Sequence, residues 1–167
     1  MNQLANPAAI TFASLVGKWS IDRQIFDKLS NLTAKVYGVA VISKQSQNEL
    51  LYNEEIQVKW ENSLETTSGS KLYKYVLSDS SKLEQYNSIY DREGNQGFEK
   101  MYDLNFYCDE ASNILFANGE FQCGPDLYKA EYEFDSLKKF QLIYEVKGKS
   151  KNFVTKTIFR KSHFVVE

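Results

Sequence analysis

Residues 17–25 read GKWSIDRQI, an alternation of inward-type and outward-type side chains that predicts a β-strand with one buried face. Trp19, placed two residues after Gly17, predicts that an indole ring plugs one end of a β-barrel at the start of its first strand. Arg160 closes the last strand-like segment of the chain. We expect its guanidinium to lie across that end, stacking on the indole and donating to nearby carbonyls.

The same two-residue period recurs along the whole chain, with turn-forming residues between the segments. In 128–134, for example, Tyr128, Ala130, Tyr132 and Phe134 share one face, and charged residues take the other. A short helical segment over 10–16 would cap the barrel. No helix-length gap separates consecutive strands, so the pattern predicts an all-β, antiparallel barrel of eight to ten strands, forming a single domain over residues 1–167. The predicted strands are 17–26, 34–43, 49–60, 70–78, 82–90, 97–107, 113–122, 128–135, 139–147 and 152–161.

Two charged residues fall on inward faces. Arg23 lies between Ile21 and Ile25, and Glu54 lies two residues after Tyr52 on the inward face of 49–60. Burying either charge alone would cost several kcal/mol. These side chains must therefore be paired, hydrated or used by the protein.

Three segments of the chain resemble a known family. They are LxGxWxIxR over residues 15–23, CGPDLY over 123–128 and YxVxGKxKNF over 144–153. In this order they resemble the uncharacterised lipocalin-like family called Domain of Unknown Function 6314, of the calycin type. The family usually has a His two residues before the Cys, where this chain has Phe121, and a Trp at the position of Tyr144. The resemblance implies a lipocalin-like β-barrel and brings no established activity.

The candidate ligand-binding residues are the two inward charges and four tyrosines on predicted inner faces. The tyrosines could line an amphipathic pocket or simply pack in the core. Arg23 could anchor a ligand carboxylate while Glu54 holds it in place, or the two could form an internal ion pair that only organises the barrel. The full set is Arg23, Tyr52, Glu54, Tyr128, Tyr132 and Tyr144.

Three functions stay open at this level. The first is a non-enzymatic binder of a small hydrophobic or amphipathic molecule with one polar or acidic end. The second is an enzyme in which Glu54 is a general acid or base, its pKa raised by burial unless Arg23 lies within ion-pair range and lowers it. The third is a protein-interaction module with a filled barrel. Lys147, Lys149 and Lys151 could draw an anionic ligand to the rim, or be a solvated turn.

Several classes of function are not expected. The net charge is −2 with both signs interspersed, which argues against nucleic-acid binding. No long apolar stretch or signal peptide is visible, so we expect a cytoplasmic protein with no integral membrane segment. Cys108 and Cys123 would then be free thiols, buried and inert, with Cys108 at most partly exposed. His163, the one histidine, could ligate haem, but its place predicts a solvated tail, so we expect no metal or cofactor. The oligomeric state is left open.

Overall fold

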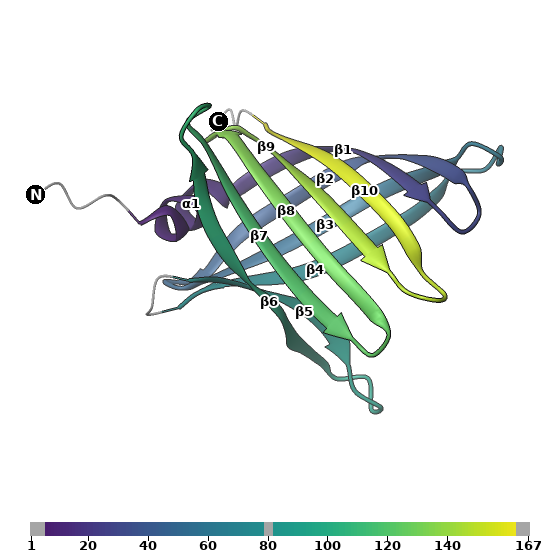
Figure 1. Cartoon of the computed structure of the whole chain (residues 1–167). Coiled ribbons are helices and arrows are strands. Elements are labelled where there is room, and N and C mark those ends of the chain that lie inside the picture. Colours follow the sequence, from purple (N-terminus) through teal and green to yellow (C-terminus); the bar gives the residue numbers. More distant parts are fainter. Residues whose placement is uncertain (1–5, 79–81, 163–167) are drawn as a thin grey trace, which may run out of the picture.

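The computed structural model of the chain describes residues 6–78 and 82–162, which form one helix followed by ten antiparallel strands (Figure 1). Each strand pairs with its neighbours in sequence, and β1 pairs with β10, so the sheet closes into a barrel. This confirms the predicted all-β antiparallel barrel. The elements are α1 (Pro7–Leu15), β1 (Gly17–Asp27), β2 (Leu32–Ser46), β3 (Glu49–Trp60), β4 (Thr67–Leu77), β5 (Leu83–Tyr90), β6 (Gln96–Asp109), β7 (Ile114–Cys123), β8 (Asp126–Ser136), β9 (Lys139–Lys147) and β10 (Asn152–Lys161).

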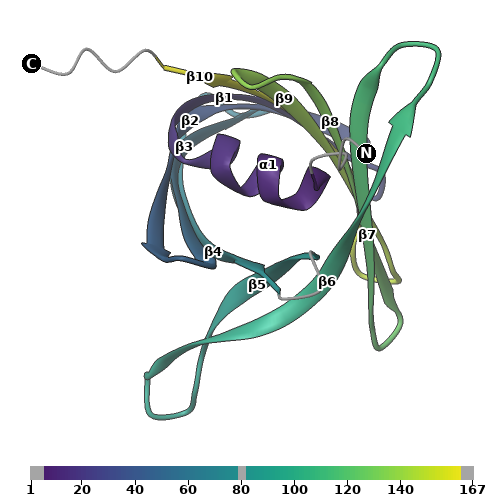
Figure 2. The same cartoon turned by 90° about the vertical axis from the view of Figure 1, so that its left-hand side faces the viewer.

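The helix α1 closes one end of the barrel, which is seen along its axis in Figure 2. Its first turn is capped by the side chain of Asn6, which accepts a hydrogen bond from the Ala8 N–H at 3.0 Å. The face that carries Phe12 and Leu15 is buried against the barrel. Trp19 is only 1% exposed, and its indole N–H donates to the Leu15 carbonyl at 2.8 Å. The predicted indole plug at this end is therefore confirmed.

The basic residue over the indole is Lys161, and the prediction for Arg160 is wrong by one position. The ammonium nitrogen of Lys161 lies 5.1 Å from the centre of the Trp19 ring and donates to the Ser14 carbonyl at 2.7 Å. Trp19 and Lys161 are directly paired across β1 and β10. Arg160 is exposed because its neighbour Phe159 faces inward and successive strand residues face opposite sides.

Both cysteines are exposed free thiols, which corrects the expectation that they are buried. Cys108 and Cys123 do lie on the inward parity of their strands, in step with buried Leu104 and Ala117. Cys108 is the last residue but one of β6 and Cys123 is the last of β7, however, and both lie beyond the packed part of the barrel. Strand parity alone therefore does not bury a side chain near the tip of a hairpin.

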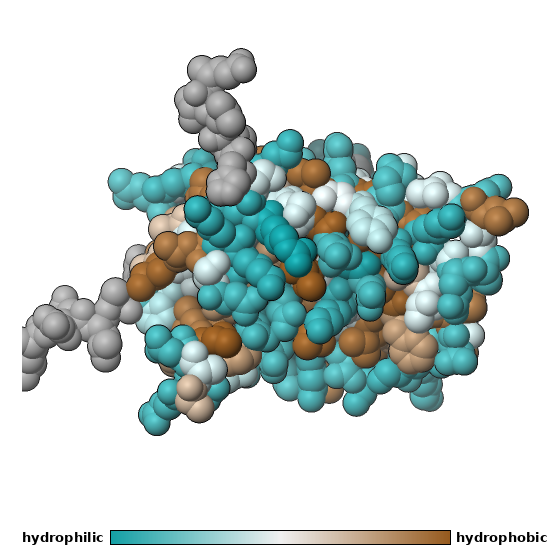
Figure 3. Space-filling view, turned by 90° about the horizontal axis from the view of Figure 1, so that it is seen from above, coloured by the Kyte–Doolittle hydropathy of each residue, from teal (hydrophilic) through white to brown (hydrophobic). Residues whose placement is uncertain are grey.

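The outer surface is largely hydrophilic on the face that Figure 3 shows, with apolar side chains between the polar ones. Exposed apolar side chains are normal for a protein surface. None of the helical residues within 6–78 and 82–162 forms a segment long and apolar enough to span a bilayer. The apolar groups are gathered instead in one cluster inside the barrel, around Trp19, Phe140 and Phe159 at the closed end.

Candidate ligand-binding cavity

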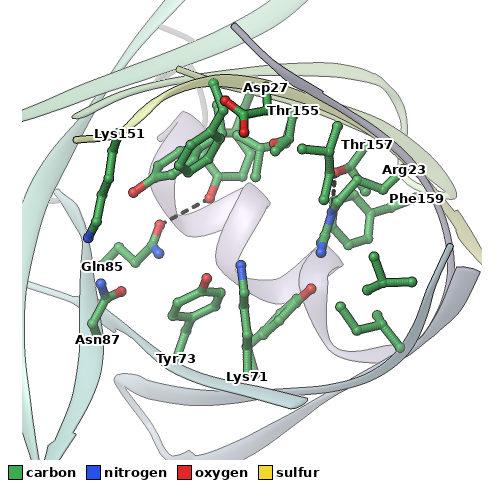
Figure 4. A pocket seen from close by; sticks show the side chains of 18 of the residues that line it. Arg23, Asp27, Lys71, Tyr73, Gln85, Asn87, Lys151, Thr155, Thr157 and Phe159 are labelled. Carbon is green, nitrogen blue, oxygen red and sulfur yellow. Dashed lines mark hydrogen bonds between the residues drawn. The ribbon is translucent and has the colours of Figure 1, made fainter. Parts of the chain in front are cut away.

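The barrel encloses a cavity of about 460 Å³ on the open side of this aromatic floor (Figure 4). Its walls come from β1, β3, β4, β5, β6, β8, β9 and β10, and its mouth is edged by Leu29, Trp60 and Lys151. Leu29 is 56% exposed, so the cavity reaches solvent. This volume lies in the range of small-molecule sites, and it disagrees with the filled interior that an interaction module would have.

The two inward charges form a bidentate ion pair, of which Arg23 lines the cavity and Glu54 does not. The terminal nitrogens of Arg23 donate to the two carboxylate oxygens of Glu54, both at 2.9 Å, and its Nε donates to the Thr157 hydroxyl at 2.8 Å. The Tyr52 hydroxyl donates to Glu54 as well. Glu54 is completely buried and Arg23 is 8% exposed. The expected pairing is thus present, and it uses three of the five N–H donors of the guanidinium.

These contacts fix the protonation state of the pair. Burial alone would raise the pKa of Glu54, but the hydrogen bonds and charge of Arg23, with the Tyr52 hydroxyl, outweigh it and hold that pKa below its ordinary value. Burial alone would lower the pKa of Arg23, and Glu54 reverses that shift too. Burial and the Glu54 charge raise the pKa of Tyr52 well above its usual range. Glu54 is therefore a carboxylate whose oxygens are already engaged.

A second polar group, centred on Gln85, lies across the cavity. The side-chain carbonyl of Gln85 accepts from the Tyr102 hydroxyl at 2.6 Å and from the Tyr132 hydroxyl at 3.1 Å. The Tyr132 hydroxyl has one proton and donates it to Gln85. Tyr75 must therefore be the donor in the 3.0 Å contact between the Tyr75 and Tyr132 hydroxyls. Burial raises the pKa of all three tyrosines well above 10, so these hydroxyls stay protonated.

The tyrosines predicted from the sequence are only partly brought together. Tyr52, Tyr132 and Tyr144 line the cavity. Tyr128 lies on the inward side of β8, but it is not part of the cavity wall. Its ring packs against Phe121 and Tyr144, with ring centres 6.2 Å apart in both cases. Tyr128 therefore supports the wall behind Tyr144 and does not face the cavity.

Several lining residues were missed in the sequence. Lys71, Tyr73 and Tyr75 alternate on β4, Gln85 and Asn87 on β5, and Tyr102 lies on β6. The alternation in KLYKY over residues 71–75 was the available signal for the first three. For the polar residues on β5 the sequence carries no comparable signal, since an inward Gln or Asn looks like any exposed one.

Several polar groups of the wall have no partner among residues 6–78 and 82–162, and the buried Oδ1 atom of Asn152 is one of them. Since the Gln85 carbonyl takes both tyrosines, its amide nitrogen is turned away from them, and no acceptor binds it. The buried Oδ1 atom of Asn87 likewise has no donor. Lys71 extends into the cavity in Figure 4 and makes no ion pair. These are the groups that the wall offers to a ligand.

The described part of the chain brings together no group of three His, Cys, Asp or Glu side chains that could hold a metal ion. His163, the residue considered for haem, lies outside the described residues.

Comparison with one solved structure supports the barrel, and another likeness is weaker. The S-type phycobiliprotein lyase CPES from Guillardia theta superposes with a TM-score of 0.54 at 9% sequence identity, over 92% of this chain and 91% of the lyase. A redesigned β-barrel, mFAP0, bound to DFHBI, gives a TM-score of 0.41 at 10% identity, over 89% of this chain and 99% of mFAP0. No curated protein sequence matches the chain. Residues 15–161 match the family of unknown function DUF6314, and the chain therefore belongs to that family.

Proposed function

We propose that the barrel binds a small amphipathic molecule in its cavity. The observation that carries this proposal is an aromatic-walled cavity of about 460 Å³, open to solvent, whose wall holds oriented polar groups without protein partners. Small-molecule sites have this form, with mostly apolar walls and a few placed polar groups. A hydrophobic body would pack against Tyr73, Leu142 and Tyr144, and polar atoms of the ligand would reach the unpaired groups.

No feature of the site favours the enzyme alternative. A general acid must carry a proton at working pH, and a general base needs a free lone pair aimed at substrate. Glu54 is ionised, fully buried and bonded by Arg23 and Tyr52. We infer that Glu54 and Arg23 stabilise the wall of the binding site, and that they do no chemistry.

Two measurements test the binding function. Native mass spectrometry of the protein purified from its own host should show a retained small molecule that dissociates on activation. Protein stripped of that molecule should bind the neutral dye N-phenylnaphthylamine with a rise in dye fluorescence.

Adjacent positions of β10 provide a matched pair of variants for the dye assay. Thr155 lines the cavity and Lys156 faces solvent. Thr155→Trp should abolish dye binding by filling the cavity, and Lys156→Trp should leave it unchanged. Val58→Trp narrows the cavity from another strand, β3, and replaces Thr155→Trp if that variant loses its thermal unfolding transition. Dye binding that survives in folded Thr155→Trp and Val58→Trp would place the dye elsewhere and refute the proposal.

A further inference from the structure

We propose that the ligand is an acid, and that its anionic oxygen group is bound inside the barrel by Lys71 and the amide nitrogen of Gln85. This inference rests on the proposed function and names the chemical class of the ligand. It differs from the expectation drawn from the sequence, in which Arg23 takes the acid.

Arg23 is a poor primary anchor because its charge is already balanced. Both of its terminal nitrogens donate to Glu54, and its Nε donates to Thr157. An incoming carboxylate would have to compete with a carboxylate that is fully buried and held by three hydrogen bonds. The N–H groups left on Arg23 can add single bonds to a ligand, but they do not make the site selective for an anion.

Lys71 supplies the unbalanced positive charge. It pairs with Glu54 across β3 and β4 and lies on the same face of β4 as Tyr73 and Tyr75, which puts its stem inside the barrel. Figure 4 shows its ammonium group reaching toward the middle of the cavity, on the side of Arg23. Within the described residues, no carboxylate lies within ion-pair distance of Lys71, whereas six other lysines of the chain have such a partner.

The remaining charges around the cavity do not cancel the positive charge of Lys71. Lys151 adds a second cation at the mouth, also without an ion pair in the described part of the chain. Asp27 is the one other acid in the wall, and the turn after β1 uses both of its oxygens. They accept from the Leu29 N–H at 3.0 Å and from the Ser30 hydroxyl at 2.9 Å. The ion pair and these three groups leave the cavity with a net positive charge, which favours an anionic ligand.

Gln85 gives the second contact. Its carbonyl accepts from Tyr102 and Tyr132, which directs the amide N–H donors away from both tyrosines. Gln85 and its partner Tyr102 are both at least 94% buried, with exposed fractions of 6% and 4%. The amide N–H of Gln85 has no acceptor among the described residues, and an oxygen of the ligand would provide one. Lys71 lies four residues along β4 from Tyr75, the residue opposite Gln85, so an oxyanion that contacts both groups would lie between them in the cavity.

The order of residues along the strands gives the direction of entry. Gln85 and Arg23 lie in the middle of the barrel, whereas Ile25, Val58 and Phe153 follow toward the open end. The acid group therefore enters first, and the apolar part of the ligand lies against the side chains nearer the mouth.

The test compares two dyes with the same aromatic body, anilinonaphthalene sulfonate and neutral N-phenylnaphthylamine. The wild-type protein should bind the sulfonate more tightly. Lys71→Met keeps the length of the side chain and removes its charge. It should weaken sulfonate binding about tenfold, as expected for losing one charge-assisted hydrogen bond, and leave the neutral dye within about twofold. Lys71→Arg should keep the preference. Lys35→Met, which removes the same charge from the outer face of β2, should change neither affinity.

The outcomes separate the two proposals. If the neutral dye binds in the cavity but Lys71→Met leaves the sulfonate preference intact, the acid site is wrong and the binding function stands. Equal loss of both dyes in Lys71→Met would also overturn the acid site, since Lys71 would then support the wall without selecting charge. If neither dye binds the stripped protein, both proposals fail.

Discussion

Replacing Arg23 by methionine would leave the Glu54 carboxylate alone inside the barrel wall. In the native protein this carboxylate has no exposed surface and accepts two hydrogen bonds from Arg23 at 2.9 Å each. Methionine fills much of the same space but donates nothing. The Tyr52 hydroxyl would be the last side-chain donor to Glu54.

The expected loss follows from the burial of the pair. Breaking a buried ion pair by removing one partner costs about 3–5 kcal/mol, because an uncompensated charge remains. For a chain of this length that corresponds to a fall in Tm of roughly 6–20 °C. Glu54→Leu should cost a similar amount, since it leaves the Arg23 guanidinium buried without a carboxylate partner. The double variant removes both charges. Its loss of unfolding free energy should be smaller than the sum of the two single losses by about 2 kcal/mol or more, although Tyr52 and Thr157 lose partners in it.

Urea unfolding followed by tryptophan fluorescence measures these losses, since Trp19 is 1% exposed in the folded barrel. The exposed pair of Lys74 and Glu49 is the control. Its atoms are also 2.9 Å apart, but the side chains are 25% and 36% exposed, so breaking it should cost no more than about 1 kcal/mol. A loss below about 1 kcal/mol in Arg23→Met, or additive losses in the double variant, would refute this account of the pair.

Two further results are expected from the cavity wall. A Cβ atom on Gly119 would come within 2.4 Å of the Tyr102 ring, so Gly119→Ala should lower the free energy of urea unfolding by about 1–3 kcal/mol. Gly97→Ala is the control and should cost less, because its Cβ atom would meet nothing closer than 3.8 Å. Equal losses in the two variants would contradict this expectation. Burial raises the pKa of Tyr75, Tyr102 and Tyr132 in the folded state well above 10. The stability that these protonated tyrosines contribute is therefore complete below pH 10, and it is lost as the pH rises through their folded-state pKa values. In an alkaline titration, tyrosinate absorbance should therefore reach its full value only as the circular dichroism of the barrel is lost, and full ionisation in an intact barrel would contradict the buried network.

The strands and the two inward charges were predictable because strand parity is a local property. In GKWSIDRQI, the neighbours of Arg23 at plus and minus two residues are apolar, and that alone places its side chain inside. The same reasoning placed Glu54 next to Tyr52 on the inner face of β3. All ten predicted strands overlap observed ones, with β2, β6 and β8 running further than predicted at both ends.

The partners across strands were not predictable, because they depend on register. That Trp19 lies opposite Lys161 and not Arg160 follows from the pairing of β1 with β10, two strands that are more than a hundred residues apart in sequence. The convergence of Tyr75, Tyr102 and Tyr132 on Gln85 likewise needs side chains from β4, β5, β6 and β8 at one height of the barrel. No local pattern carries that information. The pairing of Arg23 with Glu54 was expected, but its bidentate geometry and the added bond to Thr157 were not, and this left open whether Arg23 binds a ligand.

The hydroxyl network also accounts for a hollow interior in a barrel so rich in aromatic residues. Ten strands enclose a wider bore than eight, and inward rings would gain by moving together to fill it. Tyr75, Tyr102 and Tyr132 cannot do so without breaking their contacts of 2.6 to 3.1 Å, because their hydroxyls are tied to one another and to Gln85. Each broken contact would leave a polar group unsatisfied inside the barrel, which costs about 1–3 kcal/mol. The tyrosines are thus held against the wall at both ends, and the space between them stays available to a ligand.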